Sequence, residues 1–326
     1  MALEHRNPAW RVGLAAAVLG TAVQLCHYGV PQRVVSFLTQ PETTAFLIYL
    51  GTGRDVRFSS ASEVFSPDFM ESPPPSLPRP KAQPLPDFSE APVPEVYYAV
   101  SKSPDLEALL AQPLAWDLTG KAPSVLILHT HSTESYTKKG EDYLETARWR
   151  TLDEGYNMLS IGSHLAQCLE DLGIGVIQDR QIYDHPSYNG SYTRAREAIG
   201  AYLEKYPTIQ LVLDLHRDAS SGEGGQLRTL ARTEGLTCAQ LMVVLGTNHK
   251  AYEENVSLGL KLHALLEEKT PGLMRPLQLR AQRFNQDLCP GALLIEVGAA
   301  GNSHGEALLA VEKLAQGIAA LAKGTK

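Results

Sequence analysis

From Ala99 onward, the chain alternates between short apolar runs and longer segments in which apolar residues recur at helical spacing. Five runs are apolar almost throughout, which is typical of strands buried on both faces of a sheet; they are residues 124–128, 174–178, 209–215, 239–246 and 292–297. Four segments have the helical pattern, namely 153–172, 192–206, 251–268 and 306–322. The alternation predicts an α/β domain with a largely parallel or mixed sheet and helices on both faces.

A different pattern marks the amino terminus. Residues 12–30 carry no Asp, Glu, Lys or Arg and are flanked by Arg6, Arg11 and Arg33. A helix of this length spans about 28 Å, close to the thickness of a bilayer core. We expect a single membrane anchor with the folded domain on the extracytoplasmic side, because the preceding arginines favour a cytoplasmic amino terminus. Since the stretch is rich in alanine and includes Gln24, a cleaved signal peptide or a buried amphipathic helix stays open.

Proline dominates the segment between this span and the folded domain. Ten prolines fall between Pro67 and Pro94. Such a chain favours extended polyproline conformation and builds no core, which predicts a semi-rigid spacer; a loop without a spacing role is the alternative. The expected organisation is a tail with a transmembrane anchor in 1–32, a membrane-proximal segment and Pro-rich linker in 33–98, and one folded domain in 99–326.

Charge and cysteine content narrow the classes of function. The chain has 29 Lys and Arg against 36 Asp and Glu, a formal net charge of -7. This balance provides no basic surface for nucleic acid. The four cysteines, Cys26, Cys168, Cys238 and Cys289, are isolated and form no C-x-x-C pair. They therefore indicate neither a zinc knuckle nor a disulfide framework.

Histidine and glutamate gather where three of the predicted strands end. His131 and Glu134 follow the 124–128 run in an H-x-x-E spacing, and His216 follows the 209–215 run within Asp-Leu-His-Arg-Asp. Ligands of parallel sheets bind outside the carboxyl ends of the strands, so these side chains are expected at one edge. Two histidines and a carboxylate leave a fourth zinc position for water, as a hydrolytic zinc site requires. The H-x-x-E spacing also occurs by chance, and the alternative interpretation of His216, which is flanked by Asp214 and Asp218, is a salt-bridged core histidine.

Glu296 stands inside the apolar 292–297 run. A carboxylate within a buried strand is paired, protonated or catalytic, and an ion pair with Arg217 is the non-catalytic interpretation. In the catalytic interpretation, Glu296 takes a proton from the water and later passes it to the leaving amine. Arg217, next to a ligand, is a candidate to stabilise the tetrahedral oxyanion, a role that the metal itself could also fill.

Several of these residues lie in motifs that resemble the stage II sporulation protein P family. The motifs follow one another in the order HTHSTESY, DHPSYNGSYTRAREAI, VLDLHRDA, FNQDL and LLIEVG, and the resemblance spans residues 124–322. It implies a zinc-dependent N-acetylmuramoyl-L-alanine amidase, credited also with endopeptidase action on peptidoglycan. It further implies a membrane-anchored protein that works with a lytic transglycosylase partner during sporulation engulfment.

The resemblance also implies the roles of individual residues. By motif, the zinc ligands are His131, Glu134 and His216, and the base is Glu296. The roles of two further residues stay open. His129 is expected behind the ligands or facing substrate, and Asp153 is the rival third ligand, with helix capping as its alternative role.

Other enzyme classes fit less well. Residues 301–305 spell G-x-S-x-G, but neither Asp nor His follows them, which the chain order of a serine hydrolase would require. Phosphate-loop and dinucleotide signatures are absent from the sequence. Two alternatives remain: a non-catalytic wall-binding scaffold, and a zinc peptidase acting on free peptides. The peptidase would need a group that grips a terminal carboxylate, and the sequence singles out no arginine for that task.

Two polar loops are candidates for the walls of a glycan or peptide groove. They are residues 183–192, rich in Asn, Tyr and Ser, and residues 284–288. Loops beside such sheets often carry specificity. The alternative is ordinary turn chemistry, with Asn189-Gly190 as a tight turn.

Overall fold

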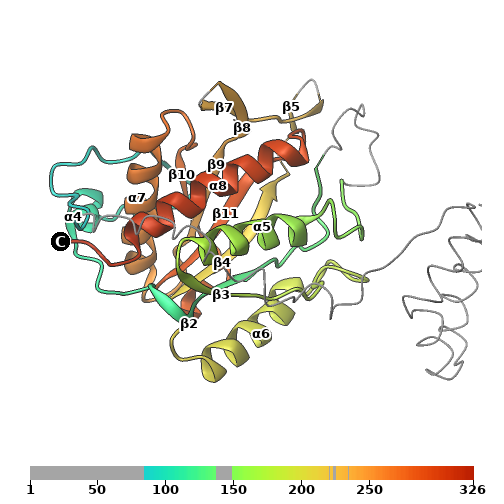
Figure 1. The fold of residues 1–326 in the computed structure, drawn as a ribbon, viewed down its shortest axis with the longest axis horizontal. Coiled ribbons are helices and arrows are strands. Elements are labelled where there is room, and N and C mark those ends of the chain that lie inside the picture. The colour runs from blue at the N-terminus through green and yellow to red at the C-terminus, as the bar shows by residue number, and fades with distance from the viewer. Residues whose placement is uncertain (1–83, 137–148, 220, 223–224, 234) are drawn as a thin grey trace, which may run out of the picture. The chain divides into compact units, whose positions relative to one another are not determined.

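The computed structural model of the chain describes residues 84–136, 149–219, 221–222, 225–233 and 235–326 (Figure 1). The predicted anchor in 1–32, and the linker as far as residue 83, lie outside the described residues. Among the helices that the structure describes, none combines the length and the apolarity needed to cross a bilayer.

A mixed seven-stranded sheet forms the centre of the domain (Figure 1). Its strands lie in the order β1 (Val96–Tyr98), β10 (Leu277–Arg280), β9 (Leu241–Gly246), β11 (Ala292–Ala299), β4 (Leu211–Asp218), β2 (Gly120–Leu128) and β3 (Ile174–Gln178). All neighbouring pairs are parallel except β9 and β11. The strands β2, β4 and β11 therefore end at the same edge of the sheet. The predicted α/β class with a largely parallel or mixed sheet is confirmed.

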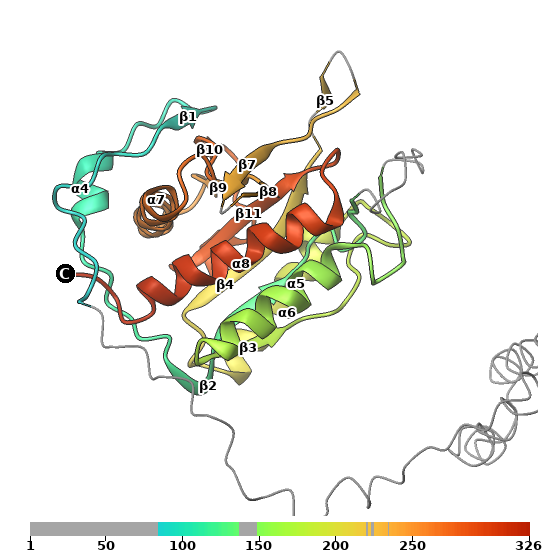
Figure 2. The same ribbon diagram turned by 45° about the horizontal axis from the view of Figure 1, so that its top comes forward.

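Helices cover both faces of this sheet, as its alternation of side chains requires (Figure 2). On β2, Val125 and Ile127 join the larger core cluster, to which α5 (Met158–Asp171), α7 (Tyr252–Lys269) and α8 (His304–Leu321) contribute. Leu126 and Leu128 point to the other face, where they pack with α6 (Ser191–Lys205). Successive strand residues point to opposite faces, so an uninterrupted apolar run is what a sheet buried on both faces needs.

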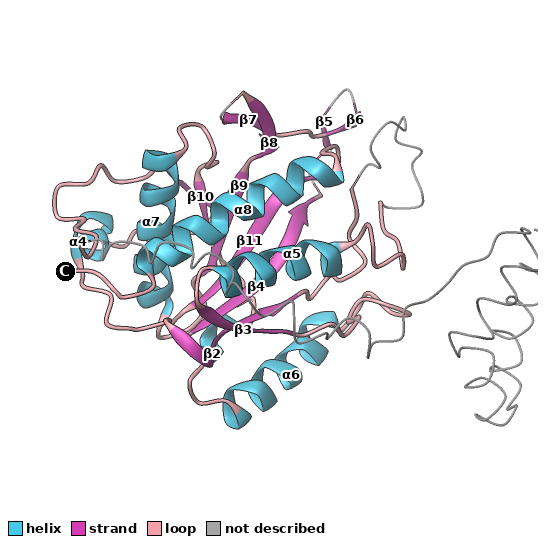
Figure 3. Cartoon of the chain, viewed as in Figure 1, coloured by secondary structure: helices cyan, strands magenta, loops and turns pink. Residues whose placement is uncertain are grey.

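Several short elements have no counterpart in the predicted pattern (Figure 3). They are β1, β10, the helix α4 (Leu106–Ala111), the 3-10 helix η2 (Gln286–Leu288), and the hairpins β5 (Ser221–Gly222) with β6 (Gly225–Gln226) and β7 (Leu230–Thr233) with β8 (Leu236–Ala239). The predicted strand 239–246 also divides, because Ala239 ends β8 in the hairpin and β9 begins at Leu241. Elements of two to six residues are too short to show a period.

Residues 84–98 lie within the range expected to be linker, and in the structure they pack against the domain. Phe88 is 6% exposed and belongs to the larger core cluster. The backbone N–H of Leu277 donates to the carbonyl of Glu95 at 2.9 Å, and β1 pairs with β10. The folded unit thus extends further toward the amino terminus than residue 99.

Candidate metal centre

The candidate residues come from the ends of three strands at one edge of the sheet. His131 and Glu134 lie in the turn directly after β2, and His216 lies near the end of β4. Glu296, on β11, is the register partner of His216. The parallel pairing of β2, β4 and β11 thus brings residues more than 160 positions apart in sequence to one place.

The first three side chains form a compact cluster. His131 Nδ1 lies 3.3 Å from Glu134 Oε1, and His216 Nδ1 lies 3.5 Å from Glu134 Oε2. One ligand atom from each residue lies within 4.8 Å of the others, and the residues are 9%, 3% and 3% exposed. A tetrahedral ion with bonds of about 2.0 Å separates its ligand atoms by about 3.3 Å. The two nitrogen-to-oxygen separations, one to each oxygen of Glu134, lie close to this value.

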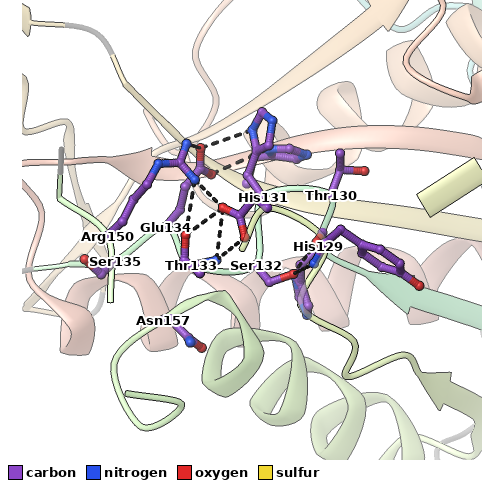
Figure 4. Close-up of polar contacts among 12 residues, drawn as sticks. His129, Thr130, His131, Ser132, Thr133, Glu134, Ser135, Arg150 and Asn157 are labelled. Atoms are coloured by element: carbon purple, nitrogen blue, oxygen red, sulfur yellow. Dashed lines mark hydrogen bonds and ion pairs between the residues drawn. The ribbon is translucent and has the colours of Figure 1, made fainter. Parts of the chain in front are cut away.

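Glu134 is oriented from the side opposite to the histidines (Figure 4). Its Oε2 accepts from the backbone N–H of Arg217 at 3.1 Å, and its Oε1 accepts from Arg150 Nη2 at 3.2 Å. Burial alone would raise the pKa of the Glu134 carboxyl. The charge of Arg217 and the hydrogen bonds from His131 and His216 outweigh that effect and hold the pKa well below its ordinary value.

Asp214 stands behind His216. His216 Nε2 lies 3.0 Å from Asp214 Oδ1, while Asp214 accepts from the backbone N–H and the hydroxyl of Thr130 at 2.8 and 2.6 Å. Burial lowers the pKa of His216, but Asp214 and Glu134 raise it more, so it lies well above its ordinary value. Metal-binding histidines commonly face a carboxylate with their second nitrogen. The sequence predicts Asp214 as a neighbour of His216 in the salt-bridge interpretation, and the i, i+2 spacing of the two residues places both on one face of the strand.

Glu296 is half-buried, and one of its carboxyl oxygens is screened from solvent. Its Oε2 is buried and has no hydrogen-bond partner among the described residues. Burial raises the pKa of Glu296 to about 8, and the carboxylates of Glu134 and Asp218 add to the rise. In its deprotonated form, Glu296 would present an acceptor oxygen beside His216.

Arg217 is 2% exposed and directs its side chain toward a loop. Its Nε donates to the carbonyl of Ser135 at 3.2 Å, and its Nη2 donates to the carbonyl of Trp149 at 2.8 Å. These contacts tie the guanidinium to the backbone that follows Glu134. Arg217 therefore lies beside the cluster, with its charge engaged by carbonyl oxygens.

The structure brings neither His129 nor Asp153 into the cluster. His129 is fully buried, with Nδ1 3.3 Å from the Leu215 carbonyl, and burial lowers its pKa to about 4. A Cβ on Gly162 would lie 2.3 Å from His129 Nε2, so the α5 helix needs glycine there to cover the ring. Asp153 is exposed and accepts from the backbone N–H of Gly155 at 3.0 Å. His129 is thus a core residue.

Two tyrosines from the 183–192 loop border the cluster. The Tyr188 ring stacks on His131 with centroids 4.6 Å apart. Tyr192 meets His131 edge-on at 5.5 Å and stacks on His216 at 6.4 Å. Beyond Tyr188 lies a cavity of about 310 Å³ that Arg150 also lines. The aromatic side chains of this loop therefore stand where a substrate would approach the cluster.

Comparison with known proteins relates the chain to one family. A family model described as Stage II sporulation protein P matches residues 81–319. Stage II sporulation protein P of Bacillus subtilis strain 168 is 32% identical over 198 residues, which cover 57% of this chain and 47% of that relative. The chain thus spans about half the length of the curated relative that it matches.

Two solved structures show distant similarity. The N-acetylmuramoyl-L-alanine amidase AmiC2 of Nostoc punctiforme has 14% sequence identity and a TM-score of 0.37, with 61% of this chain and 97% of that chain covered. The CwlD amidase from Clostridioides difficile, in complex with the GerS lipoprotein, has 14% identity and a TM-score of 0.36, with 60% and 94% covered.

Proposed function

The chain belongs to the stage II sporulation protein P family, and from this premise we propose that it is a zinc-dependent peptidoglycan hydrolase of sporulation. We propose that the bond it hydrolyses is the amide between N-acetylmuramic acid and L-alanine. The observation that carries the proposal is the cluster of His131, Glu134 and His216 with the open oxygen of Glu296 beside it. Family membership supports the substrate, and the cluster supports the chemistry.

The donor set suits zinc. Two imidazole nitrogens and one carboxylate are ligands that Zn²⁺ prefers, and Asp214 behind His216 supports the same interpretation. The residues that would hold the ion are His131, Glu134 and His216. When bound, zinc polarises a carbonyl oxygen and lowers the pKa of water toward ~7.

Glu296 serves as the general base in this proposal. Its Oε2 takes a proton from the attacking water and later gives that proton to the leaving amide nitrogen. The position of Glu296 beside His216 in the strand register keeps the proton carrier next to the reacting carbonyl. A buried oxygen with no hydrogen-bond partner among the described residues suits this task, because no existing bond has to break first.

Arg217 receives a positioning role rather than the oxyanion role expected from the sequence. Its backbone N–H orients Glu134, and its guanidinium holds the Ser135 and Trp149 carbonyls. Those contacts engage Nε and Nη2 and direct the guanidinium toward the loop after Glu134. In the proposed mechanism, the zinc site would stabilise the tetrahedral oxyanion.

The cellular setting is part of the proposal. We place residues 1–32 in the membrane as a single anchor, with the hydrolase domain on the extracytoplasmic side, where peptidoglycan lies. A lytic transglycosylase is the proposed partner, since cleavage of glycan strands complements removal of their peptides. A non-catalytic wall-binding scaffold is disfavoured by the full set of ligands together with Glu296.

The test is digestion of purified peptidoglycan by the full-length protein, with the products identified by mass spectrometry. Products with free L-alanine amino termini would support the amidase, and products cut only within the peptides would favour the peptidase alternative. Glu296→Gln should retain zinc and lose at least about 100-fold in kcat. His131→Ala or His216→Ala should lose both metal and activity. Full activity in Glu296→Gln would refute the role of the base.

A further inference from the structure

A second cavity adjoins the metal centre on the side of Tyr192. It has a volume of about 300 Å³ and is lined by Tyr192, Arg196, Gln282, Arg283, Phe284 and Asn285. Tyr192 connects the two places, because its ring stacks on His216 and also packs near Phe284, with ring centroids 5.9 Å apart. A group bound in this cavity would therefore sit next to the ligands of the metal.

The cavity has an excess of positive charge. Arg196 binds both oxygens of Asp287 at 2.8 Å, and Arg283 Nη1 lies 3.8 Å from the same carboxylate. Two guanidinium groups thus share one aspartate, and none of the lining residues is acidic. The Arg283 side chain is 57% exposed, so its donors remain open to an incoming ligand.

The loop that presents Arg283 is held in a strained conformation. Phe284 and Asn285 both have left-handed backbones, with φ of 51° and 57°. Asn285 Nδ2 donates to the Tyr192 carbonyl at 2.8 Å. The buried Gln286 side chain accepts from the backbone N–H of Gly246 and donates to the carbonyl of Val244, both at the end of β9. Consecutive non-glycine residues with positive φ are strained and persist where the surroundings fix them, often at functional sites.

The cavity and the metal centre differ in the charge of the side chains that line them. Glu134, Asp214 and Glu296 concentrate carboxyl groups around the cluster, whereas the cavity offers arginines. A carboxylate on a substrate is attracted to the exposed guanidinium of Arg283. Tyr192 and Arg196 stand one helical turn apart on α6, so a single helix face supplies both a ring and a cation.

We propose that this cavity binds a carboxylate of the substrate's peptide through Arg283, beside the ion pair of Arg196 with Asp287, and that the rings of Tyr192 and Phe284 pack against the peptide. The inference rests on the proposed function and names the part of the substrate that the site selects. An arginine fork suits a carboxylate, which accepts two parallel hydrogen bonds. The site then orients the substrate with its carboxylate at Arg283 and its scissile amide at the zinc centre.

The test uses two N-acetylmuramoyl tetrapeptides, one with free carboxylates and one with those carboxylates amidated. The full-length protein should have a KM for the free form about 10-fold or more below that for the amidated form. Arg283→Gln should raise KM for the free form and leave KM for the amidated form and kcat nearly unchanged, which removes the preference. Arg232→Gln, on the exposed β7 strand, is the matched control and should retain the preference.

Direct titration of the same two compounds separates this inference from the hydrolase proposal. If the protein cleaves neither compound but binds the free form more tightly, and Arg283→Gln abolishes that difference, the cavity assignment stands and the amidase proposal fails. If it cleaves both with equal KM, or if Arg283→Gln keeps the preference, the cavity assignment is overturned. Absence of both binding and cleavage overturns both.

Discussion

Arg150 fixes the position of Glu134, and its removal should weaken the metal site. Its guanidinium bonds Glu134 Oε1 at 3.2 Å and pairs with the buried Asp184, which also accepts from the hydroxyl and N–H of Thr133 (Figure 4). We predict that Arg150→Ala weakens zinc binding by about 10- to 100-fold, the range typical for residues behind metal ligands. Competition with a chromogenic chelator measures this affinity.

Two further variants make the Arg150 prediction specific. Arg150→Lys keeps the charge but loses the planar guanidinium that reaches two carboxylates. Its zinc affinity should therefore lie between those of Arg150→Ala and the native protein. Arg180→Ala removes an exposed arginine that pairs with Glu154, and it should bind zinc like the native protein. Unaltered zinc affinity in Arg150→Ala would show that Glu134 is held by other contacts.

The sequence reveals the proposed ligands more readily than the residues that support them. His131 and Glu134 share a local motif, and the predicted strands suffice to bring His216 near them. By contrast, Arg150 contacts Glu134 from 16 positions further along the sequence, and no local motif links the two residues. His129 continues the side of the strand that Val125 and Ile127 occupy, so its ring packs under α5, where Nδ1 faces the Leu215 carbonyl next to His216.

At the scale of elements, helix α7 contains a buried lysine that should make stability depend on pH. Lys261 is fully buried, and its Nζ donates to the Leu109 carbonyl of α4 at 2.9 Å and to Ser257 Oγ at 2.8 Å. Burial lowers the pKa of Lys261 from 10.5 to about 8. Between these values the unfolded chain binds the proton and the folded chain does not, so the free energy of unfolding should rise with pH in that window.

The variant Lys261→Met tests this coupling. Below pH 8 the native protein buries an ammonium group at a cost of roughly 3 kcal/mol, from about 1.4 kcal/mol per pKa unit. The variant loses two hydrogen bonds, although Ser257 Oγ still donates to the Leu109 carbonyl. We predict that it is more stable than the native protein at pH 7 by about 1–2 kcal/mol, and that the advantage shrinks toward pH 10.5.

Urea unfolding at pH 7 and pH 10 provides the measurement for this variant. Lys269→Met, at the exposed end of the same helix, should show no such pH-dependent difference. A stability difference that stays constant between the two pH values would mean that the pKa of Lys261 is the same in the folded and unfolded states, as for a solvated ammonium group.

The same scale shows how far hydrophobic pattern determines the fold. The helices α5 to α8 and the strands β2, β3, β4, β9 and β11 follow from long apolar patterns, and β3 has the predicted bounds. The strand β1 was missed because it lies in a Pro-rich segment and its three residues gain order from pairing with β10. Pairing partners distant in sequence, rather than local propensity, decide such elements.

At the scale of the whole molecule, the proposed ion would join segments that follow or belong to neighbouring strands of the sheet. The turn after β2 supplies His131 and Glu134, whereas β4 supplies His216. An ion that binds the folded chain and not the unfolded chain stabilises it by about 4 kcal/mol at a free concentration 1,000 times its Kd. Chelation of the holoprotein should therefore lower Tm and activity together, and added Zn²⁺ should restore both.

The variants described above distinguish this coupling from a general effect of the chelator. Glu296→Gln should lose the same Tm increment on chelation although it is inactive, because its ligands are intact. His216→Ala should start at a lower Tm and show no further shift, because its site no longer holds the ion. An equal shift in His216→Ala and the native protein, measured by differential scanning calorimetry, would place the stabilising ion elsewhere in the chain and separate it from the proposed chemistry.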